Sequence, residues 1–214
     1  MTKTAFRALV TGATLTAAAL ALAAPAAAAA RTLSYQILMG DDPIGTEEVK
    51  LDQQGDQTKV TVTATTRVKV LFINFRYDHQ REELWKGSTL QSLRGKTDDD
   101  GTPHVMELTR QGSGYVMTVD GKSSELPGNA LPLTLWTPEV LKHPLLLSVI
   151  DGARYTVNSQ TVGKETVEAG GKAQEATRHR ISGEVDRELW YAADGTLLKT
   201  RFKRSGYDIT YVLK

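Results

Sequence analysis

The sequence of 214 residues contains no cysteine. This absence excludes disulfide bonds, thiolate metal ligands and thiol catalysis, and it also excludes a lipid anchor attached to an N-terminal cysteine. The folded part of the chain must therefore be stabilised by an ordinary hydrophobic core.

An excess of charge is also missing. The chain has 26 Lys and Arg residues against 25 Asp and Glu residues, which gives a formal net charge of +1. Proteins that bind nucleic acids or anionic membrane surfaces usually carry a clear excess of basic residues. We therefore expect no nucleic-acid partner.

Charged residues are absent from one long stretch near the N-terminus, residues 8–30. Lys3 and Arg7 precede this stretch, and Pro25 is followed by a run of five alanines. A basic start, an apolar centre and an exit of small residues are typical of a secretory signal peptide. We therefore expect residues 1–30 to be cleaved near Ala30, with Ala28 and Ala29 as alternative sites.

Cleavage would leave a single β domain over residues 31–214, located in the periplasm or secreted. Removal of Lys3 and Arg7 would change the formal charge from +1 to −1. No uncharged apolar run after residue 30 approaches the roughly 20 residues that span a bilayer, so we do not expect the cleaved chain to cross the membrane. The alternative is an uncleaved membrane anchor, because residues 8–30 are long enough to serve as one.

Signatures of catalysis and metal binding are missing as well. The sequence contains no HExxH zinc motif and no Gly-x-Ser-x-Gly elbow, and Gly170-Gly171-Lys172 lacks the rest of a phosphate-binding loop. No two of the four histidines have the spacing of a metal-binding pair on one helix or strand; they are His79, His104, His143 and His179. We therefore assign no catalytic residue, metal or cofactor, although a metal site assembled from distant strands stays open as an alternative.

The strongest positive signal is alternation of polar and apolar residues. It is clear in residues 59–63, 115–119, 154–157 and 209–213, which are rich in Val, Thr, Tyr and Ile. Turn residues separate such runs at short intervals, and Asp120-Gly121 and Asp194-Gly195 are the best hairpin candidates. The pattern predicts an all-β fold: one antiparallel, strongly curved sheet of about ten to twelve strands, either a half-barrel or a barrel.

One segment departs from this pattern. Thr137-Pro138-Glu139 has the composition of a helix start, with Thr as the N-cap residue and Pro at the first helical position. Pro144 would end the helix, so we expect one short helix near residues 138–143.

A short motif occurs twice. Glu83-Leu84-Trp85 and Glu188-Leu189-Trp190 are each followed by a turn and a Thr-Leu pair. An internal duplication is one interpretation, and two unrelated hairpins of similar composition are the other.

The most polar segment covers residues 76–83. On a strand, Arg76, Asp78, Gln80 and Glu82 share one face, while Tyr77, His79, Arg81 and Glu83 share the other. One interpretation is a polar mouth in which Arg76 or Arg81 meets an anionic ligand group. The alternative is a solvated outer face with cross-strand ion pairs.

Apolar residues suggest a ligand site. A single curved sheet needs something to cover its concave face, and the leucine-rich residues 131–147 could form a lid over an apolar cavity. We predict a hydrophobic-ligand site formed by the following residues: Phe72, Phe75, Arg76, Leu135, Trp136, Leu141 and Leu146.

The order of motifs resembles an uncharacterised family of exported bacterial proteins that is known as a domain of unknown function. The resemblance rests on Tyr35, Ile44-Gly45-Thr46, Val68-Lys69-Val70, Tyr77, Glu83-Leu84-Trp85, residues 97–101, Trp190-Tyr191-Ala192, Asp194-Gly195 and Tyr211-Val212-Leu213. It implies no catalytic residues. More distantly, the chain is similar to the curved-sheet proteins that carry lipids or lipoproteins across the periplasm.

These observations lead to one main functional hypothesis, a periplasmic binding or carrier protein for a lipid-like ligand, which is not an enzyme. Two alternatives stay open. One is an envelope enzyme that uses polar residues at the sheet mouth, and the other is a partner-binding envelope protein without a small ligand. The sequence does not predict the oligomeric state.

Overall fold

The computed structural model describes residues 29–70 and 73–214. The predicted signal peptide lies almost entirely outside these residues, and so does Phe72 of the predicted site. Strand β1 begins at Ala29, so a cut after Ala30 would remove the first two residues of that strand.

The described residues form fifteen strands and one short 3₁₀ helix. In chain order these elements are β1 (Ala29–Met39), β2 (Asp42–Gln54), β3 (Gln57–Val70), β4 (Ile73–Lys86), β5 (Thr89–Asp99), β6 (Thr102–Gln111), β7 (Gly114–Val119), β8 (Lys122–Leu126), β9 (Ala130–Pro132), η1 (Pro138–Lys142), β10 (Leu145–Leu147), β11 (Arg154–Ala169), β12 (Lys172–Gly183), β13 (Arg187–Tyr191), β14 (Leu197–Arg204) and β15 (Tyr207–Leu213).

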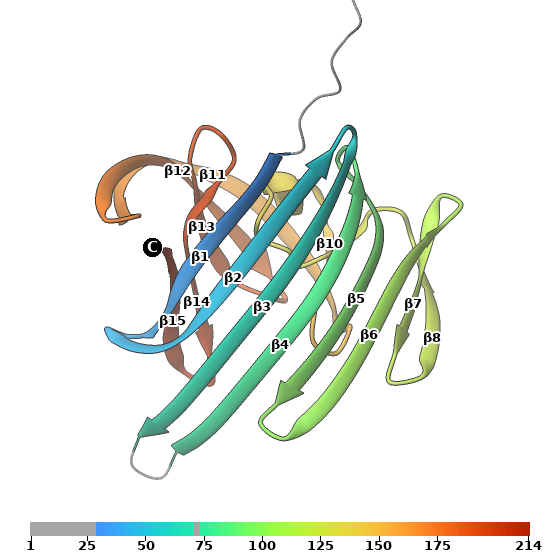
Figure 1. Ribbon diagram of the computed structural model, residues 1–214, viewed down its shortest axis with the longest axis horizontal. Helices are drawn as coiled ribbons and strands as arrows, with labels where there is room; N and C mark the ends of the chain where they lie inside the picture. Colours follow the sequence, from blue (N-terminus) through green and yellow to red (C-terminus); the bar gives the residue numbers. More distant parts are fainter. Residues whose placement is uncertain (1–28, 71–72) are drawn as a thin grey trace, which may run out of the picture.

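All fifteen strands belong to one sheet that curves into a nearly closed barrel (Figure 1). The sheet runs from β8 back to β1, continues through β15, and ends at β9. Every neighbouring pair is antiparallel except β9 and β10, which are parallel. The predicted curved, mostly antiparallel sheet is therefore confirmed, and the first and last strands pair to make it continuous. The predicted count of ten to twelve strands is wrong.

The local signals for turns and the helix are confirmed. Asp120 and Gly121 adopt positive φ angles of 49° and 81° between β7 and β8, as a tight hairpin requires. Thr137 caps η1, and its hydroxyl oxygen accepts a hydrogen bond from the Glu139 amide at 3.3 Å. The predicted helix is thus present, as a single 3₁₀ segment.

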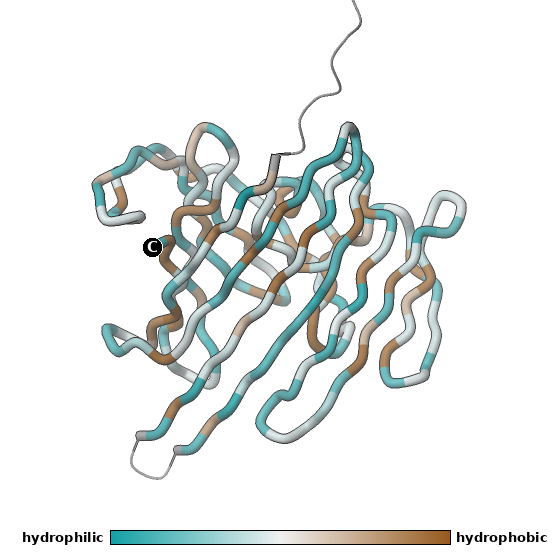
Figure 2. Tube along the Cα trace, viewed as in Figure 1, coloured by the Kyte–Doolittle hydropathy of each residue, from teal (hydrophilic) through white to brown (hydrophobic). Residues whose placement is uncertain are grey.

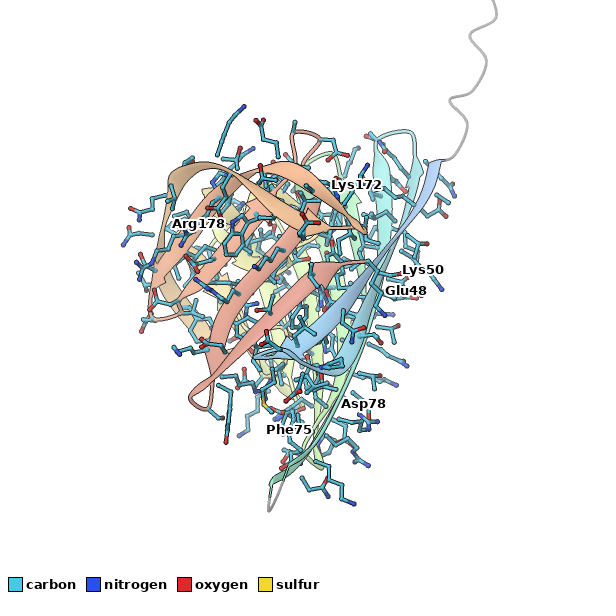
Figure 3. All side chains as sticks on the ribbon, turned by 90° about the vertical axis from the view of Figure 1, so that its left-hand side faces the viewer. Glu48, Lys50, Phe75, Asp78, Lys172 and Arg178 are labelled. Carbon is cyan, nitrogen blue, oxygen red and sulfur yellow. The ribbon has the colours of Figure 1, made fainter. Side chains whose placement is uncertain are left out.

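Apolar and polar residues alternate along the long strands (Figure 2), and most of the apolar ones are buried while most of the polar ones are exposed. On β3, for example, Val60, Val62 and Val68 point inward and are buried. Glu48 and Lys50 lie on the outside of β2 and pair with each other there (Figure 3). A large hydrophobic core fills one part of the lumen, and it includes Leu131, Leu146 and Leu147.

A second, smaller cluster lies on the outside of the barrel. The far part of the β11–β12 hairpin folds back over the outer face of β14, where Val167 and Ala169 pack against Trp190 and Leu198. Trp190 therefore lies on the outer face of the sheet, whereas Trp85 lies on the inner face. The two Glu-Leu-Trp motifs point in opposite directions, which does not support an internal duplication.

In the part of the chain that the structure describes, no helix has the length and apolar character that a membrane crossing requires.

Candidate functional site

The lumen contains two groups of charged side chains, one within a buried hydrogen-bond network and one along the wall of an open cavity. The first group surrounds the carboxylate of Glu83 on β4, whose side chain is almost completely buried. This carboxylate accepts hydrogen bonds from the Arg81 guanidinium at 2.7 Å, the Thr134 hydroxyl at 2.8 Å and the indole N–H groups of Trp85 and Trp136, each at 2.8 Å. Four donors occupy its acceptor sites, which makes burial of the charge tolerable.

His79 completes this group. Its Nε2 lies 3.1 Å from Nη1 of Arg81, and its Nδ1 lies 2.8 Å from the Thr97 hydroxyl. A guanidinium can only donate, so Nε2 must accept and the ring must be neutral with its proton on Nδ1. Burial, with the nearby Arg81 charge as a second cause, lowers the pKa of His79 to about 3.

The Glu83 group fixes residues 133–144, which we call the inner segment, to the barrel wall. Thr134 and Trp136 bind Glu83 directly, and the Tyr191 hydroxyl donates to the carbonyl oxygens of Leu135 and Thr137 at 3.0 and 3.2 Å. On either side, β9 and β10 are members of the sheet. The expected lid over residues 131–147 thus lies inside the barrel, where these hydrogen bonds and the pairing of β9 and β10 hold it against the wall.

The second group lines an open cavity of about 370 Å³ between the sheet and the inner segment. Eight charged or titratable side chains other than tyrosines contribute to its wall: Glu47, Arg81, Asp99, His104, Asp151, Arg187, Lys203 and Arg204. Six of them have a polar or charged partner within the protein. Arg204, for instance, forms a bidentate pair with Asp99 at 2.7 and 2.8 Å, and His104 lies 2.9 Å from Asp120.

Glu47 and Arg187 are the exceptions. Within residues 29–70 and 73–214, neither side chain forms a hydrogen bond or an ion pair, with each other or with any other group. The Arg187 guanidinium stacks on the Phe202 ring at 3.8 Å, and its Nε atom is buried without an acceptor. Burial raises the pKa of Glu47, against the attraction of Arg81 and Arg187. Burial also lowers the pKa of Arg187, against the influence of Tyr211 and Glu47.

A second cavity, of about 150 Å³, adjoins the first. The two cavities share four wall residues, Tyr77, Phe202, Arg204 and Tyr211. The rest of the smaller wall is mainly aliphatic and aromatic: Ile37, Met39, Ile44, Thr66, Val68, Phe75, Ser205 and Ile209. The lumen thus holds an apolar compartment next to a charged one.

The structure brings together only some of the predicted site residues. Phe75 lines the smaller cavity, while Leu135 and Trp136 line the larger one. Leu146 is fully buried in the main core, and Leu141 packs against that core.

Arg76 lies elsewhere. It is exposed on the outer face of β4 and pairs with Asp98, whereas Arg81, the other arginine considered for an anion, faces the lumen. Asp78, on the same outer face as Arg76, is visible on the outside in Figure 3. The face with Tyr77, His79, Arg81 and Glu83 is thus the inner one.

Comparison with known proteins places the chain in a family. Residues 35–214 match the family model described as "Domain of unknown function (DUF6134)". The chain belongs to this family. No curated protein matches it.

A solved structure shares the fold. The crystal structure of a "Beta-barrel-like Protein of Domain of Unknown Function DUF1849" from Brucella abortus aligns with a TM-score of 0.65. The alignment covers 86% of this chain and 94% of that chain, at 9% sequence identity. At this identity the similarity concerns the fold alone.

Within the described residues of this DUF6134 protein, no group of three or more His, Asp and Glu side chains is arranged to hold a metal ion. The candidate site is the pair of adjoining cavities, in which an apolar wall meets a charged one.

Proposed function

We propose that this DUF6134 protein is an exported binding protein for a lipid-like, amphipathic ligand, which it holds in the two adjoining cavities of the barrel. The observation that carries the proposal is the contrast between the cavities. The smaller one is lined mainly by apolar groups, and the larger one carries charged groups. An amphipathic molecule has the same division, with a chain for one compartment and a head for the other.

The size of the cavities supports a guest with one chain. Together they fall in the range of roughly 300–1,000 Å³ that is usual for small-molecule sites. A dry cavity of about 150 Å³ accepts a guest of about six carbon atoms. Burial of six methylenes contributes about 5 kcal/mol before the costs of association are subtracted, so the apolar end of a ligand supplies a large part of the affinity.

The proposal differs from the sequence-based hypothesis in one respect. The ligand lies between the sheet and the inner segment, but this segment is a fixed wall. Entry therefore occurs through the open side of the larger cavity rather than by movement of residues 131–147.

The experiment is native mass spectrometry of protein purified from the export compartment, followed by calorimetric titration with fatty acids and lysophospholipids. Val68→Trp places a large ring in the smaller cavity and should weaken binding by about tenfold or more. Val162→Trp is the matched control, because Val162 is half-exposed on the outside of β11. The absence of any bound or titrated amphiphile would contradict the proposal and favour a partner-binding role.

One observation favours an enzyme as a second candidate. Glu47 is an unpaired carboxyl in a cavity, and its raised pKa is a property that general acids and bases share. Mass analysis of each ligand after prolonged incubation distinguishes the two functions. A binding protein returns the ligand unchanged, whereas an enzyme returns a product whose formation Glu47→Gln abolishes.

A further inference from the structure

The unpaired charged side chains in the larger cavity indicate which charges the head group of the ligand has. Glu47 on β2 and Arg187 on β13 line the same cavity, and neither has a polar partner among the residues that the structure describes. A charge that is withdrawn from water without a partner destabilises the folded state, so proteins generally pair such groups. The other six charged or titratable groups of this wall follow that rule.

The surroundings of Arg187 suit an anion. Stacking on Phe202 holds the guanidinium plane in place, and this leaves its N–H groups available for a bidentate acceptor such as a phosphate or a carboxylate. The hydroxyl groups of Tyr77 and Tyr211 belong to the same wall, and neither has a hydrogen-bond partner among the described residues. Both can donate to an anion held by Arg187.

The surroundings of Glu47 suit a cation. Its neighbours across the sheet are Tyr35 on β1 and Ala64 on β3. The Tyr35 hydroxyl donates to the carbonyl oxygen of Leu197 at 3.0 Å, and Ala64 has no polar side chain. Neither neighbour therefore donates to the carboxylate. The Arg81 charge attracts Glu47, but the Arg81 guanidinium donates its hydrogen bonds to Glu83, His79 and Thr134. A ligand that carried only an anionic group would satisfy Arg187 and leave the half-buried Glu47 carboxylate of the same cavity to repel it.

We propose that the ligand is a zwitterionic amphiphile, in which an anionic group contacts Arg187, an ammonium group contacts Glu47, and the apolar chain enters the smaller cavity. This inference rests on the proposed binding function. Two opposite charges in one head satisfy both unpaired side chains at once. A neutral head satisfies neither, and an anionic head satisfies one.

The test compares four probes with the same single acyl chain: lysophosphatidylethanolamine, lysophosphatidic acid, the free fatty acid and monoacylglycerol. The zwitterionic probe should bind wild-type protein about tenfold more tightly than each of the others, because it makes at least one more hydrogen bond to a charged side chain than any of them. Glu47→Gln should abolish this preference and tighten binding of the two anionic probes. Arg187→Gln should weaken binding of the zwitterionic and both anionic probes and leave the neutral one unchanged.

Glu48→Gln is the matched control. Glu48 is the next residue on β2, but it lies on the outer face with Lys50, so its neutralisation should leave all four affinities unchanged (Figure 3). Unfolding curves of each variant show whether it is folded.

The outcomes separate the two proposals. Equal affinity of wild-type protein for all four probes would overturn the zwitterionic head and leave the binding function intact. Tightest binding of the fatty acid or of lysophosphatidic acid, unaffected by Glu47→Gln, would assign an anionic head instead. Failure of all four probes to bind folded wild-type protein would contradict the binding function itself.

Discussion

Two glutamates face the lumen of the same barrel, and their surroundings differ completely. Glu83 receives hydrogen bonds from four side chains on two parts of the chain: Arg81 and Trp85 lie on β4, and Thr134 and Trp136 lie in the inner segment. Glu47 receives none from any residue that the structure describes. Glu83 connects parts of the protein with each other, whereas Glu47 is directed to a cavity. The comparison indicates that saturation of hydrogen bonds distinguishes a structural charge from one that is available to a ligand. Burial follows the same order, since Glu83 is almost completely buried and Glu47 is half-buried.

The largest effect should follow from neutralisation of Glu83. Glu83→Gln replaces one carboxylate oxygen by an NH₂ group, which would face the hydrogen-bond donors that this oxygen now accepts from. The substitution also removes the negative charge that neutralises the buried Arg81 guanidinium. We expect a loss of about 3–5 kcal/mol in the free energy of unfolding, measured by urea denaturation. The control is Glu188→Gln, which changes the other Glu-Leu-Trp motif. Glu188 pairs with Arg178 and Arg201 on the outer face, so this variant should lose about 1 kcal/mol or less. Equal losses would remove the distinction between the inner and outer motifs.

These motifs also show how far the sequence predicts the fold. Both read Glu-Leu-Trp on strands before a turn, yet Leu189 faces the core and Leu84 is exposed. A shift of one residue reverses the faces of a strand, and the sequence does not specify the register.

Local signals such as Asp120-Gly121 and Thr137-Pro138-Glu139 are predictable because they depend on few residues. The strand count is not, because β9 and β10 are three-residue strands, nearly all buried, without alternation.

The site is less predictable than the fold. Glu47 and Glu48 are adjacent and chemically identical, and only the register of β2 determines which one faces the lumen. Arg187 belongs to a strand far along the chain, so its proximity to the same cavity is a tertiary property. The one signal available in the sequence is a polar residue at an inward position of an alternating strand. This signal identifies Arg81 and Glu83 as well, and it does not separate paired charges from unpaired ones.

The next largest effect should be the pH dependence of the free energy of unfolding that arises from His79, the titratable neighbour of Arg81 in the Glu83 group. The unfolded chain protonates His79 near its ordinary pKa of 6.5, but the folded protein resists protonation until about pH 3. Unfolding between these values takes up a proton, so stability falls as the pH is lowered. We expect a loss of about 1.4 kcal/mol for each pH unit below about 6, measured by urea denaturation at several pH values. His79→Gln keeps an acceptor for Arg81 and removes the titration, so its curve should be flatter. Parallel curves would show that His79 is not the responsible group.

A smaller effect should distinguish a fixed inner segment from a mobile one. Trp136→Phe retains the ring but removes one of the four hydrogen bonds to Glu83, and we expect a loss of about 1 kcal/mol in the free energy of unfolding. Trp190→Phe is the control, since Trp190 donates to Glu165 on the outside of the barrel and should lose less. If residues 133–144 were a mobile lid, Trp136→Phe would leave stability unchanged.

The smallest effect on stability should come from Glu47. Because burial raises its pKa, the ionised form of Glu47 weakens the folded state at neutral pH, and this cost disappears as the pH falls and the carboxyl becomes protonated. Glu47→Gln removes the cost but also removes the attraction of Glu47 to Arg81 and Arg187, so the two changes partly offset each other. We expect the free energy of unfolding at pH 7 to change by less than about 1 kcal/mol, in contrast to Glu83→Gln.

Any difference between Glu47→Gln and wild-type protein should shrink at acidic pH, where both carry a neutral side chain at position 47. Urea denaturation at pH 7 and at pH 4 measures both expectations, with Glu48→Gln as the surface control. A loss as large as that of Glu83→Gln would show that Glu47 stabilises the apoprotein, and it would then no longer be available to a ligand. A near-neutral result combined with altered preference for zwitterionic amphiphiles would assign Glu47 to ligand recognition, because a side chain retained for folding should cost stability when it is replaced.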